Sequence, residues 1–529
     1  MAAEPQLVDA GVLEVRNPAT LEQVGTVPIS SREAVQEAVN EARLAQEAWA
    51  GATFAERRAL LGRAAEVLLD HLDEVAETIT GETGKPLAEA LTSDLLVSLD
   101  CLVWLGRNAE GVLRPERVRY PQPLLKHKRG WLAYEPLGVV GLISPWNFPL
   151  GIPLSQVATA VVAGNAAVLK PSELTPLTGA WIERAFRQAG APNGLVRVVQ
   201  GTGETGAALV GARGVAKIVF TGSREAGRKV AAAAAQRLVP VTLELGGKDP
   251  MLVFEDADLP RAVEGALWGS FLNCGQTCAA VERIYVHRDL FEPFVEELAR
   301  RAGELTLGRG ANPDVDLGPL VSERQRAKIE ELVDDAVAHG ARVRTGGRRP
   351  ELGLPGWFFE PTVLTDVRPD SRIQKEELFG PVVTVARFDN DADAVRLAND
   401  SGFGLGASVW TRDLERAGRV ARKLEAGMVW TNDVAYSYGA CQASWGGRKQ
   451  SGYGTTHSKH GLYAMSSVKF VDADSGRVPV PWWFPYDERV ADGFRGVIGV
   501  LYEHGLAAKA SSVWRHRRGL VSLARRYVK

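Results

Sequence analysis

Two cysteines four residues apart, Cys274 and Cys278, are the residues whose types and spacing point most directly to chemistry. They lie in the segment FLNCGQTCAA, residues 271–280, which consists mostly of small and polar residues. A cysteine thiolate can bind a metal, exchange with a second thiol, or act as a nucleophile. The spacing alone leaves all three roles open, so the rest of the sequence has to separate them.

A metal site is the least supported of these roles. Zinc needs further Cys or His ligands at set spacing, and the remaining cysteines, Cys101 and Cys441, show no such clustering in the sequence. We therefore predict no metal ligands. A disulfide between Cys274 and Cys278 under oxidative stress stays open, because its geometry cannot be judged from sequence.

The composition is that of an ordinary globular protein of more than one domain. The chain has 529 residues, of which 45% are hydrophobic and 24% charged, and its formal net charge is -2. This charge balance argues against a nucleic-acid partner. Four cysteines cannot form a disulfide framework and suit a reducing compartment. The N-terminal MAAEPQLVDA has no features of a secretion signal, so we expect a cytoplasmic protein.

The elements that must position a reactive thiol follow an alternating order from residue 137 onward. The predicted strands are apolar without polar alternation, which is typical of a parallel sheet covered by helices on both faces. We predict strands at 138–143, 166–171, 195–200, 216–222 and 240–247, and helices at 153–164, 178–190, 205–213 and 225–237. This order predicts a doubly wound, nucleotide-binding α/β architecture. A second α/β stretch follows to about residue 440, with strands at 280–287 and 380–388.

Residues 137–169 carry no charge, which raises the question of a membrane span. Prolines and polar residues interrupt this stretch, and unpaired backbone is costly in lipid, so we predict a buried strand, loop and helix instead. The first hundred residues are predicted to be helical. Ser30 with Glu33, and Thr53 with Glu56, match capping boxes at the helix starts.

Two glycine-rich turns compete as the phosphate-binding loop. GTGETG, residues 201–206, matches the G-x-G-x-x-G pattern between a strand and a helix, but no ribose-binding acid follows at the next strand end. FTGSREAG follows that next strand and also brings small residues to a helix start. One of the two loops is expected to be only a tight turn.

Six motifs occur in one order along the chain: SPWNFPL, LKPSELTP, FTGSREAG, LELGGKDP, GQTCAA and EELFGPV. In this order and at these separations they resemble the aldehyde dehydrogenase superfamily, over roughly residues 10–470. Each motif alone is a weak signal, whereas the ordered set is specific. The resemblance implies an NAD(P)-dependent oxidation of an aldehyde.

That chemistry needs three groups. A thiolate attacks the aldehyde to give a thiohemiacetal, hydride leaves to nicotinamide, and water hydrolyses the resulting thioester. By resemblance, Cys278 is the nucleophile and Glu244 the general base for water. Asn147 and the Cys278 backbone N–H would be the oxyanion donors. Cys274 is then a small residue packed behind the loop, with reversible protection of Cys278 as the alternative.

The resemblance also assigns the cofactor-binding residues. Lys170 and Glu173 would meet the adenosine ribose, Gly222, Ser223 and Gly227 the pyrophosphate, and GTGETG would be the tight turn. Glu377 would bind the nicotinamide-side ribose, with Phe379 beside the nicotinamide. The remaining predicted contacts are Ser144, Pro145, Trp146, Ser172 and Leu245. Because a carboxylate at Glu173 repels a 2′-phosphate, we predict NAD as the cofactor, with NADP open if Glu173 swings away from Lys170.

The implied fold is α/β, with a doubly wound dinucleotide-binding domain, a second α/β catalytic domain and a small β oligomerisation element. The corresponding ranges are 1–118 with 138–246, 247–445, and 119–137 with 446–475, followed by a C-terminal arm at 476–529. The strand-like segments KRGWLAYEPLG and SSVKFVDA are expected to pair between subunits. The predicted partner is therefore a second copy, in a homodimer or a dimer of dimers.

Several positions depart from the family pattern and leave the substrate open. Gln156 stands where many members carry Lys, SWGG places Trp445 where PFGG is usual, and Thr455 and Thr456 replace a common Arg-Glu. Since no cationic clamp is readable, we favour apolar or aromatic aldehydes. The alternatives are an NADP-preferring semialdehyde dehydrogenase or a catalytically silent binding protein on this fold. Glu244 disfavours a CoA-acylating enzyme.

The C-terminal arm is absent from most members of the family. From Lys509 to Lys529 every charged residue is basic, and VPVPWWFPYDERV before it is rich in proline and aromatic residues. The arm either packs its apolar side on its own protein, crosses a substrate tunnel with Trp482, Trp483 and Phe484 as anchors, or rests on an anionic membrane.

Overall fold

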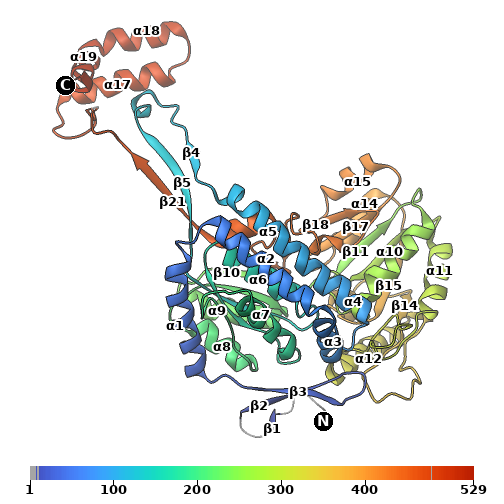
Figure 1. Ribbon diagram of the computed structural model, residues 1–529. Coiled ribbons are helices and arrows are strands. Elements are labelled where there is room, and N and C mark those ends of the chain that lie inside the picture. The colour runs from blue at the N-terminus through green and yellow to red at the C-terminus, as the bar shows by residue number, and fades with distance from the viewer. Residues whose placement is uncertain (1–6, 9–10, 478, 529) are drawn as a thin grey trace. The chain divides into compact units, whose positions relative to one another are not determined.

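The computed structural model describes residues 7–8, 11–477 and 479–528 (Figure 1). The chain divides into two compact units. The larger contains the described residues up to Leu113 together with Glu135–Ser467. The smaller contains Arg114–Tyr134 and the described residues from Val468 onward. All six family-like motifs fall in the larger unit.

The larger unit holds a six-stranded sheet of order β20-β10-β9-β6-β7-β8. Its parallel strands are β6 (Val139–Ile143), β7 (Ala166–Lys170), β8 (Val196–Val198), β9 (Val215–Gly222) and β10 (Val241–Leu245). The chain winds from β6 outward to β8, then returns to the other side of β6 for β9 and β10. Such a reversal is where doubly wound sheets bind ligands, at the carboxyl ends of the strands. The predicted fold class is confirmed.

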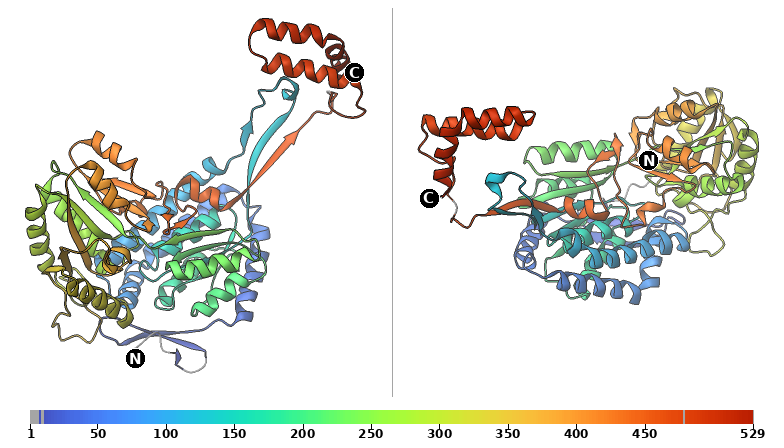
Figure 2. Two further views of the ribbon diagram at one scale, coloured as in Figure 1. Left: turned by 180° about the vertical axis from the view of Figure 1, so that it is seen from behind. Right: turned by 90° about the horizontal axis from the view of Figure 1, so that it is seen from above.

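Helices cover both faces of this sheet (Figure 2). One group of helices consists of α6 (Gly151–Val162) and α7 (Pro176–Gln188), which pack against α2 (Phe54–Asp70). A second group consists of α8 (Gly203–Gly211) and α9 (Arg224–Ala235), which pack against each other and against β9. Every residue of β6, α6 and β7 is buried, so the uncharged stretch is the predicted strand, loop and helix of the interior. Within the described ranges, no helix combines the length and apolarity that a membrane crossing needs.

The N-terminal segment differs from the prediction. β1 (Leu7–Val8), β2 (Val12–Arg16) and β3 (Gln23–Pro28) form an antiparallel sheet, so a wholly helical first hundred residues is wrong. β1 has only two residues and β3 is mostly exposed, so neither gives the apolar run or the sustained alternation that indicates a strand. The helices that follow are α1 (Arg32–Trp49), α2, α3 (Leu72–Thr83), α4 (Leu87–Glu89) and α5 (Val97–Leu113), with a π-helical turn, η1 (Ala90–Leu96), before α5.

The two predicted helix caps have different outcomes. At α2 the Thr53 hydroxyl accepts from the Glu56 backbone N–H and the Glu56 carboxylate accepts from the Thr53 N–H, so the capping box is confirmed. At α1 the cap is Ser31, whose hydroxyl accepts from the Ala34 N–H. The Ser30 box is wrong, because the Ser30 hydroxyl accepts instead from the Gln200 N–H.

A second sheet of order β13-β14-β15-β12-β11-β17-β18 forms the other half of the larger unit. β11 (Asp249–Val253), β12 (Val281–His287), β15 (Val382–Phe388) and β17 (Gly406–Trp410) form its parallel centre. Around them lie α10 (Leu259–Phe271), α11 (Phe291–Gly303), α12 (Glu323–Ala338), β13 (Arg342–Thr345), β14 (Thr362–Thr365), α13 (Arg372–Lys375), α14 (Asp391–Asn399), α15 (Leu414–Ala421) and β18 (Met428–Thr431).

The segment after this sheet returns to the first one. β20 (Gly452–Tyr453) pairs antiparallel with β10, although its residues fall in the predicted oligomerisation element. The neighbouring short elements are η3 (Leu272–Gly275), β16 (Phe403–Gly404), η4 (Tyr436–Tyr438), β19 (Arg448–Lys449) and α16 (Ser458–Ala464). The chain therefore passes from the first sheet to the second and returns to the first through β20.

The smaller unit begins with a three-stranded sheet of β4 (Glu116–Val118), β5 (Arg129–Pro136) and β21 (Ser466–Ala473). A short turn, η2 (Pro123–Leu125), separates β4 from β5. Asp472 joins the sheet's two sequence segments, since its carboxylate accepts from Tyr120 Oη and Lys128 Nζ, each at 2.9 Å.

Three helices end the chain: α17 (Glu488–Tyr502), α18 (Leu506–Arg515) and α19 (Arg517–Val528). α17 places Gly493, Gly496 and Gly499 on its buried side. A Cβ at Gly493 would lie 2.5 Å from the Gly519 carbonyl oxygen, and one at Gly496 would lie 2.8 Å from Leu520. Glycine at these positions is what allows α19 to approach α17 closely.

Candidate active site

A cleft of about 240 Å³ in the larger unit is lined by the three predicted catalytic side chains Asn147, Glu244 and Cys278. The chain reaches it at the carboxyl ends of adjacent strands. Asn147 follows β6, the Gly222–Ser223 turn lies at the end of β9, and Glu244 is the penultimate residue of β10. Cys278 comes from the loop between α10 and β12 on the opposite wall.

The loop that carries Cys278 has an unusual backbone. Asn273, Cys274 and Gly275 all have positive φ, at 53°, 56° and 70°. A Cβ at Gly275 would lie 2.1 Å from the Gly380 carbonyl oxygen, so only glycine fits there. A positive φ strains the backbone of a non-glycine residue such as Asn273 or Cys274, and this conformation persists only where surrounding contacts hold it. Here the Glu89 carboxylate accepts from the Asn273 N–H at 2.9 Å.

The two cysteines of this loop have different surroundings. Cys274 is 1% exposed and packs in an apolar cluster with Leu320, Ile329 and Leu378. Cys278 is partly exposed and lines the cleft. Burial raises the pKa of the Cys278 thiol, and the nearby acidic groups, led by Asp249, raise it further. Cys278 is thus the cysteine that a substrate in the cleft can reach.

Glu244 is buried without a partner. Its side chain is 4% exposed, and neither carboxylate oxygen has a hydrogen-bond partner among the described residues. Burial holds the pKa of Glu244 well above the usual range of a carboxyl group. A purely structural carboxylate at a strand end would be paired, and Glu244 is not. An unpaired buried carboxylate facing a cleft is instead suited to proton transfer.

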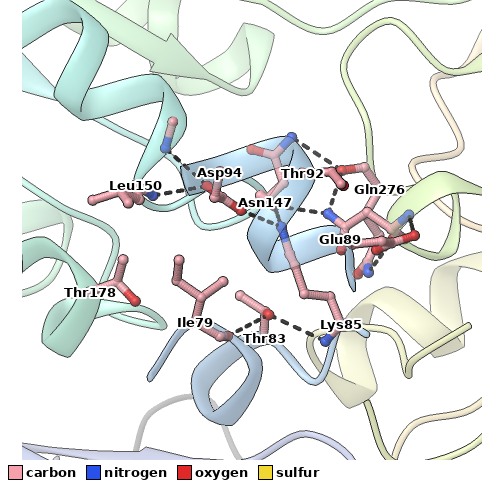
Figure 3. A network of polar contacts seen from close by, with 12 residues as sticks. Ile79, Thr83, Lys85, Glu89, Thr92, Asp94, Asn147, Leu150, Thr178 and Gln276 are labelled. Carbon is pink, nitrogen blue, oxygen red and sulfur yellow. Dashed lines mark hydrogen bonds and ion pairs between the residues drawn. The ribbon is translucent and has the colours of Figure 1, made fainter. Parts of the chain in front are cut away.

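Asn147 is held by a buried polar network (Figure 3). Its Nδ2 donates to the Gln276 carbonyl at 3.1 Å, which links it to the Cys278 loop. The backbone carbonyl of Asn147 accepts from Lys85 Nζ at 2.7 Å and from Asn273 Nδ2 at 2.9 Å. Lys85 also pairs with Asp94 at 2.9 Å, and both side chains are fully buried. The network fixes the backbone of Asn147 against both walls of the site.

Asp94 anchors the segment after Asn147 as well. Its Oδ1 accepts from the backbone N–H groups of Leu150, at 3.1 Å, and Gly151, at 2.9 Å, where α6 begins. Asp94 lies in the π-helical turn η1, and such turns are frequent at functional sites. Sequence reasoning missed Lys85 and Asp94, because no local pattern distinguishes a buried ion pair from surface charges.

The predicted cofactor residues fall into two groups. Those that line the cleft are Pro145, Trp146, Gly222, Ser223, Leu245, Glu377 and Phe379. Ser144, Lys170, Ser172, Glu173 and Gly227 do not line it. Lys170 ends β7 and pairs with Glu173 at 2.8 Å, and a Cβ at Gly227 would lie 2.6 Å from Leu245. GTGETG, at the start of α8, is not part of the cleft lining either.

These surroundings fit a nicotinamide dinucleotide. The Gly222–Ser223 turn opens α9 at the cleft, where a helix N-terminus favours a pyrophosphate. Trp146 and Phe379 meet edge to face at 5.4 Å, and Phe379 has φ 58°. The Glu377 carboxylate accepts from the Gly247 N–H at 3.1 Å, and burial raises its pKa to about 7. Among the described residues, no group of three His, Cys, Asp or Glu could hold a metal ion.

Comparison with known proteins identifies the family. The model of the aldehyde dehydrogenase family matches residues 7–471. The chain is 39% identical over 472 residues to a betaine aldehyde dehydrogenase of Mesorhizobium japonicum, covering 89% of this chain and 95% of the relative. It is 43% identical over 456 residues to a 3,6-anhydro-alpha-L-galactose dehydrogenase of Streptomyces coelicolor, covering 85% and 91%.

The solved structures agree. The NAD+ complex of an aldehyde dehydrogenase from Bacillus cereus superposes with a TM-score of 0.84 at 37% identity, covering 88% of this chain and 93% of the other. The chain belongs to the aldehyde dehydrogenase family, and it is an NAD(P)-dependent aldehyde dehydrogenase. The residues after 471 lie beyond the family match.

Proposed function

We propose that this enzyme prefers NAD and oxidises an aldehyde to its carboxylate through covalent intermediates on Cys278. The observation that carries the proposal is the meeting of Cys278, unpaired Glu244 and anchored Asn147 in one cleft. Asn147 Nδ2 has two N–H groups. One donates to Gln276 and orients the side chain, which leaves the second for the aldehyde oxygen.

In this proposal Cys278 attacks the carbonyl carbon, and the Asn147 amide and the Cys278 backbone N–H stabilise the oxyanion that forms. NAD, held by the Gly222–Ser223 turn and Glu377, supplies the hydride acceptor when bound. Glu244 then takes a proton from the water that hydrolyses the thioester. Its freedom from protein hydrogen bonds supports this role.

For the substrate we propose an apolar or aromatic aldehyde. Ile152, Tyr438 and Trp445 line the cleft, and the Tyr438 and Trp445 rings meet edge to face at 4.9 Å. A cationic aldehyde is the second candidate, because aromatic faces also attract ammonium groups and several relatives are named for betaine aldehyde or aminoaldehydes.

A panel of purified substrates tests both proposals. Hexanal, phenylacetaldehyde, betaine aldehyde, 4-aminobutanal and succinic semialdehyde would be compared by kcat/KM with NAD and with NADP. We expect the uncharged aldehydes with NAD to give the highest values. Preference for the two cationic compounds would select the second candidate, and preference for the semialdehyde with NADP would contradict both. A panel without any turnover would favour a silent binding protein.

We also propose that β21 pairs with a second copy of the chain. β21 lies at one edge of its three-stranded sheet, and its Val468 and Phe470 are 56% and 54% exposed. Unpaired apolar edge strands recruit further strands. We expect a dimer or a dimer of dimers in light scattering, and a stable monomer at micromolar concentration would contradict this.

We propose that the C-terminal segment from residue 481 onward contacts an anionic membrane surface. Trp483, Phe484 and Trp514 are 67%, 83% and 71% exposed, and the charges after Glu503 are all basic. Exposed aromatic rings beside basic residues favour the interface of anionic lipids.

Sedimentation with vesicles tests this contact. The full-length enzyme should bind vesicles of phosphatidylglycerol and phosphatidylcholine, lose binding as salt is raised, and ignore pure phosphatidylcholine. The double variant Phe484→Ser/Trp514→Ser should bind less, whereas Trp268→Ser, an exposed tryptophan of α10, should not change binding. Equal sedimentation with both kinds of vesicle, or none, would contradict membrane contact.

A further inference from the structure

Two buried cysteines, Cys101 and Cys441, meet in the larger unit although 340 residues separate them in sequence. Their Sγ atoms are 2.9 Å apart, and each residue is 3% exposed. Both are free thiols, and either sulfur can donate the hydrogen bond between them. The sequence gives no sign of this contact, because the fold brings together positions that no local spacing connects.

Backbone contacts position both Cys101 and the segment that carries Cys441. Cys101 lies one turn after Val97 on α5, so the two side chains share a face of the helix. A Cβ at Gly439 would lie 2.9 Å from Val97 Cγ1, which places the chain before Cys441 against the preceding turn of α5. The Cys441 carbonyl accepts from the Ser458 N–H at 2.7 Å. The segment is thus held on α5 from one side and by α16 from the other.

We propose that Cys101 and Cys441 form an oxidative modification site, at which a peroxide converts the two thiols reversibly to a disulfide. One thiol attacks the peroxide, the O–O bond breaks, and a sulfenic acid and one water or alcohol result. The second thiol then attacks the sulfenic sulfur, forming the S–S bond and releasing water. The two sulfurs lose two electrons in total and the peroxide gains them. A dithiol reverses the reaction by exchange.

The crosslink would act on the wall of the cleft. Tyr438, three residues before Cys441, lines the cleft, and its hydroxyl lies 3.3 Å from Ser155 Oγ on α6. Trp445, four residues after Cys441, lines it too. A covalent bond at Cys441 would tie this segment to α5 and so limit its movement during substrate entry. Because it would close a loop of 340 residues, it would also stabilise the fold against unfolding.

The neighbouring pair Cys274 and Cys278 is the competing site. Cys274 packs in an apolar cluster behind its loop, whereas Cys278 faces the cleft. Cys278 should therefore meet peroxide first, and the two processes have to be measured separately. The hydrogen bond with Cys441 and burial raise the pKa of Cys101 well above that of an ordinary thiol. Since the thiolate is the reactive form, linkage should be slow at neutral pH and faster as the pH rises from 7 to 9.

The experiment exposes the native full-length enzyme to hydrogen peroxide, removes the peroxide, and then denatures it without reductant in the presence of N-ethylmaleimide, so that buried free thiols are blocked as they become exposed. A Cys101–Cys441 bond makes a looped chain that migrates faster on a denaturing gel, and a tryptic digest yields the linked peptide by mass spectrometry. We expect both signals, their loss with dithiothreitol, and a higher melting temperature of the oxidised enzyme. Cys274→Ser should behave like the parent, whereas Cys101→Ser and Cys441→Ser should give neither signal.

Mapping on the unsubstituted enzyme keeps the test valid if either serine variant folds poorly. A Cys274–Cys278 peptide in place of the Cys101–Cys441 peptide would overturn the proposal. So would thiols of Cys101 and Cys441 that stay alkylatable after Cys278 is fully oxidised, or a linked peptide that appears only in denatured protein.

Discussion

At the scale of single residues, the environment of each acidic group sets its role. Glu244 is buried without a partner, so its carboxylate is poised to move a proton, whereas Glu173 is paired with Lys170 near the end of β7. Motif order was enough to predict these residues because the chemistry requires particular side chains at strand ends. Their burial and pairing depend on distant segments and could not be predicted.

The raised pKa of Glu244 predicts a shifted acidic limb in the pH profile. The base acts as its carboxylate, so steady-state turnover should fall as the pH drops through a pKa well above ~4.3, the value of an ordinary Glu. The pre-steady-state burst of NADH should lack this limb, since hydride transfer precedes hydrolysis. Stopped-flow and steady-state rates between pH 5 and 9 would show it. The same limb in both phases would contradict the role.

Cofactor choice depends on the charge of Glu173. Glu173→Gln removes the carboxylate that repels a 2′-phosphate, so kcat/KM with NADP relative to NAD should rise by roughly tenfold or more, the factor for about 1.4 kcal/mol. Glu204→Gln, in the GTGETG turn that is not part of the cleft lining, serves as the matched control and should leave the ratio unchanged. A shift in the control but not in Glu173→Gln would mean that GTGETG holds the phosphates.

At the scale of elements, the parallel strands and the helices between them were predictable, whereas the N-terminal sheet and the contacts between distant segments were not. β6 to β10 are short apolar runs separated by helices, a pattern that leaves little choice of architecture. The N-terminal sheet was missed because β1 has only two residues and β3 is mostly exposed. The Lys85–Asp94 pair and the Cys101–Cys441 contact were missed for another reason. Cys101 and Cys441 lie 340 residues apart, and the network of the Lys85–Asp94 pair is completed by backbone groups of Asn147, Leu150 and Gly151, far along the chain.

The π-helical turn η1 should control activity through Asn147. Lys85→Met leaves Asp94 buried without its partner and frees the Asn147 carbonyl, so we expect a loss of about 3–5 kcal/mol in stability and a fall in kcat. The double variant Lys85→Met/Asp94→Leu should recover stability, because a buried pair can be replaced by apolar groups. If its kcat also recovered fully, Lys85 would have only a structural role. Thermal unfolding and kcat measured on both variants decide this.

At the scale of the whole molecule, the catalytic unit and the C-terminal helices are separate features. The family match ends at residue 471, and the three helices that follow are held by their own glycine-lined contacts. The predicted family and fold are confirmed for the larger unit. The packing of the arm could not be predicted, because close helix approach at Gly493 and Gly496 depends on the partner helix as much as on the glycines.

Those contacts predict a local defect. Gly496→Ala places a Cβ 2.8 Å from Leu520, so α17 and α19 should separate and the C-terminal helices should become sensitive to protease. Gly111→Ala on α5 is the control, since nothing lies within 4 Å of its Cβ, and it should be neutral or stabilising. Aldehyde turnover should persist in both variants. Protease resistance equal to the parent in Gly496→Ala would contradict the close packing.

The central claim is that Cys278 carries the acyl group and Glu244 removes it. It is tested most directly by mixing the Glu244→Gln variant with NAD and a substrate aldehyde and measuring its intact mass. We predict one acyl adduct per chain, mapped to Cys278, one equivalent of NADH, and steady turnover reduced by about 10²–10⁴-fold. Cys278→Ser should give neither adduct nor NADH. An adduct on Cys274, or undiminished turnover by Glu244→Gln, would contradict the account.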